Sequence, residues 1–332
     1  MSIRIDRRKF LASVGVAGGA MALGPHRAHS EEVTLRVVSA WTEGTAFSRA
    51  FERYVDRVNE TGKGVIQFNY LGGGSKIMNV FDMGQALRRG VFDVLNTTAG
   101  YYGNLMPEAN AMKLKRVSYQ EFRDNGGYDF YNELLAQKVN AHWLGRGKGD
   151  VPFHVYLGDS VQTLSEPRFD NLKLRVSPNY RAFFTALGAT LVQTQGSEIY
   201  TAMERNVVDG YGWPIQGIDE LGLLPVTTKR IDPGFYVAPN EILINLDVWN
   251  KLGDEQKAVL TDAAEWVETW LDSYEEEENE KARKLQAENG IETLEFTGEQ
   301  AEKYLEIAYE SGWEELLNMA PENGPRLREL MS

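Results

Sequence analysis

The order of predicted elements, strand-helix-strand-helix-strand, occurs twice in this sequence, and this repeat constrains the fold more than any other feature. Alternating or β-branched runs indicate the strands, and apolar residues three and four positions apart indicate the helices. In the first copy the elements span residues 33–39, 47–58, 65–71, 80–89 and 91–95. In the second copy they span residues 172–176, 180–187, 190–193, 197–205 and 207–210. The copies also share a junction, RGVFD at 89–93 and RNVVD at 205–209.

Strands that alternate with helices predict an α/β fold with parallel sheets and helices on both faces of each sheet. Two copies of the repeat predict two such lobes. Ligands of open α/β sheets bind beyond the carboxyl ends of the strands. We therefore expect a binding site in the cleft between the lobes.

The last third of the chain is predicted to be helical. Apolar residues at helical spacing indicate one helix from an N-cap at Asp254 to residue 288, just before Gly290. Such a helix is roughly 50 Å long, which exceeds one lobe and is enough to run behind both. The acidic run at 275–278 is typical of a solvated face, with cation binding as the alternative. A last amphipathic helix is predicted over residues 299–319.

Composition excludes several classes of protein. The 332 residues suffice for one large or two medium domains. The absence of cysteine excludes disulfide scaffolds, zinc–thiolate sites, iron–sulfur clusters and thiol nucleophiles. A formal net charge of −13 argues against binding to nucleic acid through phosphate contacts.

The N-terminus resembles a removable export signal. Arg7 and Arg8 precede an apolar stretch at 11–23 and a small-residue end at Ala28-His29-Ser30, and paired arginines suggest the twin-arginine route. The alternative is a membrane anchor, for which 13 residues are short. Residues 1–30 hold five of the 35 basic and one of the 48 acidic residues, so the remaining chain carries 30 and 47, a net charge of −17. We expect a periplasmic protein.

Motifs of catalysis are scarce. The sequence GGGSK at 72–76 lacks the spacing of a phosphate-binding loop and is interpreted as a connector between a strand and a helix. The sequence contains no G-x-S-x-G, H-E-x-x-H or G-x-G-x-x-G motif, and no carboxylate pair is spaced like an acid–base dyad. This favours a binding protein over an enzyme, without a cofactor or metal.

Arg175 is the most informative candidate for ligand binding. It lies near the carboxyl end of the predicted strand LKLRV, and its planar guanidinium matches a carboxylate. The alternative is a surface arginine on an edge strand. Trp213 follows Tyr211 and Gly212 at the end of another strand, where an aromatic side chain lines a ligand pocket or packs in the core.

Further candidates follow the strands of the first copy. Trp41 follows the first strand, and Thr97, Thr98 and Tyr101 follow the third. His154 lies within an alternating strand at 151–157, where a single histidine is usually structural. We count these residues and Tyr211 as candidate binding residues.

Several spaced segments together resemble the solute-binding subunit of TRAP transporters (tripartite ATP-independent periplasmic transporters). These are LKLRV at 172–176, LGA at 187–189, EIYTAM at 198–203, VDG at 208–210, GVFD at 90–93, Tyr101, Pro107, residues 240–260 and the long helix. The resemblance covers nearly the whole chain after residue 30. It implies a two-lobed periplasmic binding fold with a helix spanning both lobes, capture of a small organic acid and its delivery to membrane permease subunits.

The resemblance also assigns roles to single residues. It implies that Arg175 binds the ligand carboxylate and that Trp213 contacts the ligand, as in the keto-acid-binding branch. Some members of that branch have a metal-binding glutamate where this chain has Gly212, which puts a metal in doubt. Many relatives have an arginine or glutamine where this chain has Phe153 or His154. The resemblance therefore does not identify the ligand of this chain.

The expected lobes are residues 31–153 with 240–278, and residues 154–239 with 279–332. Two alternatives to a transport protein stay open. One is an exported enzyme, a hydrolase or oxidoreductase. The other is a ligand-sensing module with the same fold that signals to a membrane receptor.

Overall fold

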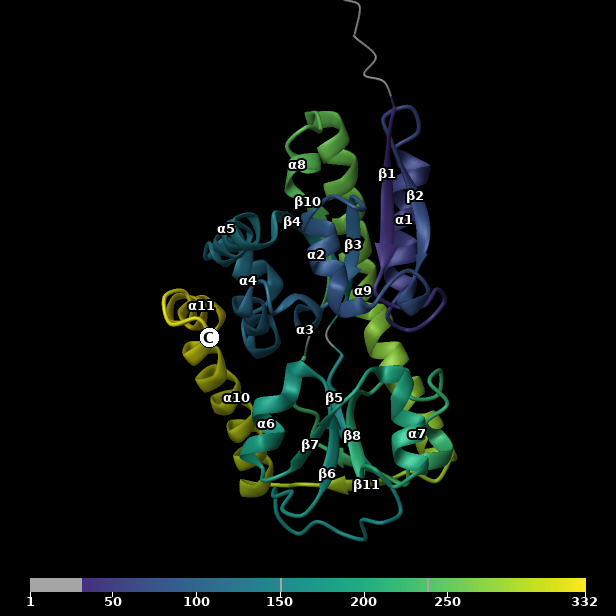
Figure 1. The fold of residues 1–332 in the computed structure, drawn as a ribbon, viewed down its shortest axis with the longest axis vertical. Coiled ribbons are helices and arrows are strands. Elements are labelled where there is room, and N and C mark those ends of the chain that lie inside the picture. Colours follow the sequence, from purple (N-terminus) through teal and green to yellow (C-terminus); the bar gives the residue numbers. More distant parts are fainter. Residues whose placement is uncertain (1–31, 150, 238) are drawn as a thin grey trace, which may run out of the picture. The chain divides into compact units, whose positions relative to one another are not determined.

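The computed structural model of the chain describes residues 32–149, 151–237 and 239–332. The predicted export signal lies outside these residues. The described part forms two β-sheets with helices packed around them (Figure 1). The helices are α1 Arg49–Thr61, α2 Met83–Arg88, α3 Ala99–Tyr102, α4 Tyr119–Asp124, α5 Gly127–Val139, α6 Arg181–Ala186, α7 Ile199–Glu204, α8 Leu246–Trp249, α9 Asp254–Glu288, α10 Glu299–Met319 and α11 Gly324–Met331. None of them is long and apolar enough to cross a membrane.

The first lobe is built on a five-stranded sheet of order β2-β1-β3-β10-β4. Its strands are β1 Val33–Ser39, β2 Ile66–Gly73, β3 Val94–Thr97, β4 Ala141–Lys148 and β10 Asn240–Asn245. β1 is parallel to β2 and β3, whereas β10 is antiparallel to β3 and β4. Helix α1 buries Phe51, Tyr54 and Val58 in a core shared with strand residues such as Val37.

The second lobe is built on a six-stranded sheet of order β11-β9-β5-β8-β6-β7. Its strands are β5 Phe153–Leu157, β6 Lys173–Val176, β7 Thr190–Gln193, β8 Gly210–Pro214, β9 Lys229–Asp232 and β11 Glu292–Glu295. β6 is parallel to β7 and β8, whereas β5 is antiparallel to β8 and β9. The expectation of purely parallel sheets was wrong, because β10 and β5 enter their sheets in the opposite direction.

The internal repeat is confirmed by the strand order. In both lobes the three strands of the repeat lie second-first-third, and an antiparallel strand follows the third. The third strand of the second copy begins only at Gly210, later than the predicted residue 207.

The shared junction has one structural role in both copies. Asp93 donates its backbone N–H to Arg36 O at 2.8 Å, and its carboxylate accepts the N–H of Arg36 at 2.7 Å. Asp209 makes the same pair of bonds with Lys173, at 2.7 and 2.8 Å. The second junction position, Gly90 or Asn206, has a positive φ, which glycine and asparagine tolerate best. The junction motif therefore fixes the return from helix to strand.

Helix α9 contacts both sheets, as the predicted length requires (Figure 1). Near its middle, Glu275 bonds Lys148 of β4 at 3.2 Å. Near its end, Gln286 accepts from Arg230 of β9 at 2.7 Å and donates to Ile215 O at 2.8 Å. The predicted C-terminal end at Glu288 is confirmed, whereas the helix begins one residue earlier than predicted, because Gly253 and not Asp254 is the N-cap.

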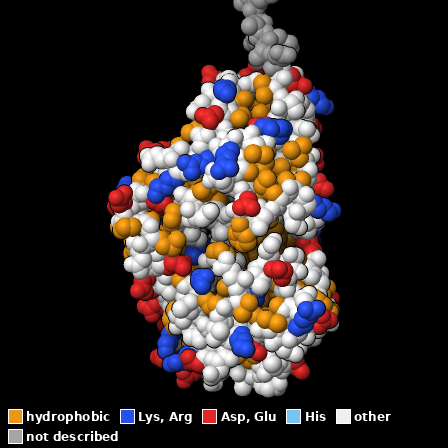
Figure 2. Space-filling view, in the orientation of Figure 1, with side chains coloured by type: hydrophobic (Ala, Val, Ile, Leu, Met, Phe, Trp, Pro, Cys, Tyr) orange, Lys and Arg blue, Asp and Glu red, His pale blue; other side chains and the backbone are white. Residues whose placement is uncertain are grey.

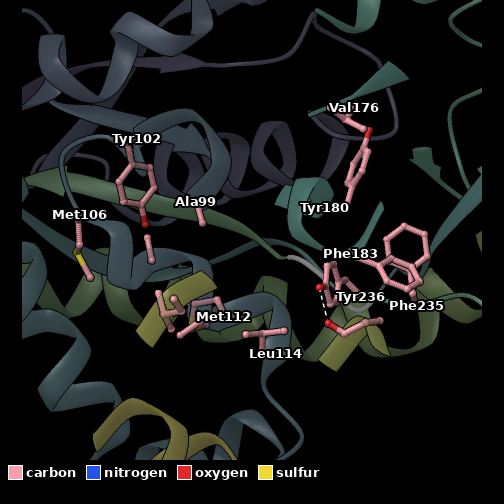
Figure 3. Close-up of a cluster of buried hydrophobic side chains, with 14 of the residues drawn as sticks. Ala99, Tyr102, Met106, Met112, Leu114, Val176, Tyr180, Phe183, Phe235 and Tyr236 are labelled. Atoms are coloured by element: carbon pink, nitrogen blue, oxygen red, sulfur yellow. Dashed lines mark hydrogen bonds between the residues drawn. The ribbon is translucent and has the colours of Figure 1, made fainter. Parts of the chain in front are cut away.

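Helix α10 also has its predicted bounds, but it is not the last helix, because α11 follows and packs against α5. The larger hydrophobic core is shared between the lobes (Figure 3). It includes Tyr102 from the first lobe and Tyr180 and Phe183 from the second, and Met112 and Leu114 lie between these groups in the view. The exact boundaries of the lobes stay a prediction.

A buried acid lies in the first lobe beside this core. The carboxylate of Glu241 on β10 accepts hydrogen bonds from the hydroxyls of Tyr102 and Tyr131, the second at 2.6 Å. The two hydroxyl oxygens lie 2.9 Å apart, and since each hydroxyl has one proton, all three contacts can be hydrogen bonds only when Glu241 is protonated and donates one of them. Burial raises the pKa of Glu241 from 4.5 to about 7, although both tyrosine hydrogen bonds lower it.

This pKa predicts a pH dependence of stability. Since the folded state binds the Glu241 proton more tightly than the unfolded state, the stabilisation is complete below pH 4.5 and is lost as the pH rises to about 7. Relative to Glu241→Gln, the wild type should lose up to about 3 kcal/mol of unfolding free energy across this window. Urea denaturation at several pH values measures this. The exposed substitution Glu302→Gln is the control, and parallel curves for wild type and Glu241→Gln would contradict the prediction.

Candidate functional site

Arg175 lies near the end of β6 and is buried, with only 3% of the residue exposed. Its Nε and Nη2 donate to Thr194 O at 3.1 and 2.5 Å, and its Nη1 donates to the hydroxyl of Tyr180 at 2.8 Å. The Tyr180 hydroxyl in turn donates to Gly212 O at 2.5 Å. These bonds use three of the five guanidinium N–H groups, and no acceptor among the described residues takes the other two. The side chain is thus held in one orientation with hydrogen-bonding capacity left over.

Trp213 lies near the end of β8, beside Arg175. The Arg175 guanidinium carbon lies 5.7 Å from the centre of the indole. Glycines allow the backbone to approach the indole, because a Cβ on Gly196 would lie 2.9 Å from it and one on Gly217 would lie 3.4 Å from its Nε1. This buried Nε1 has no hydrogen-bond partner among the described residues.

Aromatic side chains of the first lobe face this pair. Phe47, just before α1, makes an edge contact with Trp213 at a centroid distance of 5.8 Å. Trp41 lies 5.9 Å from Phe47 and 5.8 Å from Tyr101, and Phe81 lies 5.3 Å from Tyr101. Aromatic faces from two lobes therefore enclose the space in front of Arg175.

This space is a cavity of about 140 Å³. Arg175, Trp213, Trp41, Phe47, Phe81 and Tyr101 border it, together with the polar side chains of Thr42, Thr45, Ser75, Ser177, Gln195, Ser197 and Glu220. A hollow bordered by hydrophobic side chains is visible near the middle of the face in Figure 2. The volume suits a small molecule and not a polymer.

A smaller chamber of about 50 Å³ adjoins the cavity and shares Arg175 and Trp213 with it. Its additional polar side chains are Thr98, Lys148, Asn179 and Asn240. Lys148 donates to Ala46 O at 2.9 Å, to Gln216 at 2.8 Å and to Glu275 at 3.2 Å. Burial lowers the pKa of Lys148, and the Glu275 carboxylate opposes this shift. The Glu275 carboxylate compensates the charge of Lys148, whereas no acidic side chain among the described residues forms an ion pair with Arg175.

The predicted residues separate into two groups in the structure. Arg175, Trp213, Trp41 and Tyr101 border both chambers, and Thr98 borders the smaller one. Thr97, His154 and Tyr211 border neither. Thr97 is fully buried at the end of β3.

His154 and Tyr211 lie within the second lobe. His154 is fully buried and its Nδ1 contacts Ile231 O at 3.0 Å and Asp232 Oδ1 at 2.9 Å. Its neighbour Phe153 borders the smaller chamber instead. Tyr211 stacks on Tyr156 at 5.2 Å and bonds the hydroxyl of Thr227 at 2.7 Å.

Several residues that border the two chambers are not among the predicted ones. Phe47 was interpreted as part of a helix face, but it precedes α1 and turns toward Trp213. Tyr180, Ser177 and Gln195 follow strand ends, which is the signal that identified Arg175. No sequence pattern identifies Lys148 as a bordering residue, because β4 and α9 come together only in the folded chain.

The site does not fit the metal that some relatives of the keto-acid-binding branch are expected to hold. A Cβ on Gly212 would lie 2.4 Å from the ring of Tyr180, so a glutamate there would displace the residue that orients Arg175. Within the described residues, no group of three His, Asp or Glu side chains is arranged to hold a metal ion.

Two α/β lobes around a small buried cavity are the arrangement expected of a two-lobed solute-binding protein. The bacterial extracellular solute-binding proteins of family 7 match residues 37–316, and the chain belongs to this family. The resemblance inferred from sequence is thereby confirmed.

Individual relatives are distant. The chain is 25% identical over 232 residues to the ectoine-binding periplasmic protein TeaA of Halomonas elongata, which covers 66% of this chain and 64%, less than two thirds, of TeaA. It is 22% identical over 303 residues to the monocarboxylate 2-oxoacid-binding periplasmic protein all3028 of a Nostoc species, covering 85% of this chain and 82% of that protein. A TRAP periplasmic solute-binding protein from Desulfovibrio salexigens, solved with orotic acid, has a TM-score of 0.77 at 17% identity, covering 90% of this chain and 97% of that chain.

The hydroxyl of Tyr180 should be needed for stability. In Tyr180→Phe, Gly212 O loses its donor and one Arg175 N–H loses its acceptor, both in the interior. We expect the unfolding free energy of the ligand-free protein to fall by about 1–3 kcal/mol in urea denaturation. The half-exposed Tyr200→Phe is the matched control and should change it by less than about 0.5 kcal/mol. Equal effects of the two substitutions would refute this role.

Proposed function

We propose that this chain is the solute-binding receptor of a TRAP transporter, which captures a small organic carboxylate between its lobes and delivers it to membrane permease subunits. The observation that carries the proposal is the buried Arg175 guanidinium, oriented by Thr194 and Tyr180 and left with two N–H groups. Two N–H groups on one planar cation match the two oxygens of a carboxylate.

The surroundings strengthen such a contact. Arg175 makes no ion pair within the described residues, whereas Lys148 is paired with Glu275. A ligand carboxylate would therefore compensate a buried charge that the protein leaves open. With a net charge of −17 after residue 30, the chain as a whole does not attract anions, so capture depends on this local donor.

The aromatic walls suit the body of the ligand. Trp213 and Phe47 from the two lobes meet edge to face, with Trp41 and Tyr101 beside them. A flat or partly apolar body would pack against these faces, and the hydroxyls at the border would bond its polar groups. The ligands named for the relatives, ectoine, 2-oxoacids and orotic acid, are small molecules that carry a carboxylate.

Family membership supports a receptor over an enzyme and a site of action outside the cytoplasm. Delivery to permease subunits, the periplasmic location and removal of residues 1–30 are parts of the proposal. Closure of the two lobes on the ligand, about the predicted boundaries, is a further part.

Substitution of Arg175 tests the proposed site. Against a panel of small organic acids screened by thermal shift and then titrated by calorimetry, Arg175→Ala should reduce affinity by at least 30-fold, since truncating a buried charge pair costs about 2–5 kcal/mol. Arg175→Lys keeps the charge but not the planar fork and should also bind poorly. Trp213→Ala should weaken binding less, through lost contact area.

The exposed Arg205→Ala, on the same lobe, is the control and should bind as the wild type does. If Arg175→Ala binds within threefold of the wild type, the ligand lies elsewhere and the assignment of Arg175 fails.

The twin-arginine assignment has its own test. Replacing Arg7 and Arg8 by lysine should leave the protein in the cytoplasm, because the paired arginines are the recognised signal. Fractionation of cells expressing the full chain measures this. Normal export of the variant would refute the route while leaving the binding function intact.

A further inference from the structure

We infer that Glu220 makes this cavity selective for acids with a single carboxylate and excludes dicarboxylates. The inference rests on the proposed function and concerns the same cavity. Glu220 follows β8 in the second lobe and borders the larger chamber but not the smaller one. Its side chain is 23% exposed.

The first lobe holds the Glu220 carboxylate in place. Its Oε2 accepts the backbone N–H of Ala46 at 2.7 Å, and its Oε1 accepts from Arg49 Nη1 at 2.7 Å. Arg49 donates further to Gly44 O at 2.8 Å and to the hydroxyl of Tyr274 at 3.1 Å. The carboxylate thus joins the two lobes while it borders the space for the ligand.

The charges around the two chambers then specify the ligand. Among the described residues that border them, the charged side chains are Arg175, Lys148 and Glu220. Lys148 is paired with Glu275, so Arg175 alone is available for an anion. The remaining charged side chain at the border is Glu220, whose ion pair with Arg49 likewise offsets its charge, so a second carboxylate on the ligand would find no free cation there.

Such a second carboxylate would lose its hydration without gaining a cation. Arg49 is not an alternative partner, because it already bonds Glu220 and lies 3.9 Å from Glu278. Arg49 offsets part of the Glu220 charge, so repulsion between the two carboxylates adds to this loss and is not its only cause. The other polar side chains of the larger chamber carry hydroxyls, indole N–H groups and the amide of Gln195, all of which can bond uncharged carbonyl groups of a ligand.

The test compares matched pairs of acids that differ only in one charge. Succinamate with succinate, glutaramate with glutarate, and 3-carbamoylbenzoate with isophthalate each exchange one carboxylate for an amide of the same shape. Calorimetry on the wild type should give at least tenfold tighter binding of the amide in each pair that binds. In Glu220→Gln this ratio should fall at least tenfold.

The ratio of the two affinities within each pair distinguishes a change in ligand specificity from a general loss of structure. Loss of the contact between the lobes in Glu220→Gln would weaken both members of a pair equally and leave the ratio unchanged, which would overturn the inference. The exposed Glu204→Gln is the control and should keep the wild-type ratio. Wild-type binding of dicarboxylates as tight as that of their amides would also overturn it.

Different results would contradict the proposed function and the role of Glu220. If dicarboxylates bind tightly and Arg175→Ala abolishes their binding, the carboxylate site stands and only the role of Glu220 falls. If no member of the panel binds, or if binding does not depend on Arg175, the proposed function falls and the inference falls with it.

Discussion

Lys148 lies where three parts of the molecule meet, and its buried ammonium group holds them together. It projects from β4 of the first lobe, bonds Glu275 on α9 and bonds Gln216 of the second lobe. Gln216 also donates to Glu275 at 2.7 Å, which closes the network. A buried ion pair adds little over an apolar replacement, but removal of one partner leaves a buried charge and costs about 3–5 kcal/mol. The network therefore fixes how the sheets and α9 meet, and through Lys148 it borders the smaller chamber.

Much of this architecture could be predicted from local sequence patterns. The two copies of the repeat, and α9 and α10 with their bounds, depend on short-range periodicity and on breakers such as Gly290. The junction is visible in the sequence as the similar segments RGVFD and RNVVD. The structure explains the similarity, because Asp93 bonds Arg36 and Asp209 bonds Lys173 in the same way. The direction of β5 and β10 could not be predicted, because both strands pair with partners far away in the sequence.

The candidate site was predictable to the extent that residues follow strand ends. That rule found Arg175, Trp213, Trp41 and Tyr101, because carboxyl ends of parallel strands meet at one edge of a sheet. It could not exclude His154 or Tyr211, whose buried partners Asp232 and Thr227 come from other segments. It could not find Lys148 either, because the pairing of that residue with Glu275 exists only in the folded chain.

Because the two lobes share a hydrophobic core, the stability of each lobe depends on the other. Phe183 of the second lobe lies 5.0 Å from Tyr304 of α10, while α10 also packs against the 107–114 segment of the first lobe. Apolar surface buried jointly by both lobes is exposed when either one unfolds. Neither lobe is therefore an autonomous folding unit, and damage to the core of one lowers the cooperative melting of both. If the lobes close on a ligand as proposed, this shared core limits the motion to a rotation that leaves the core buried.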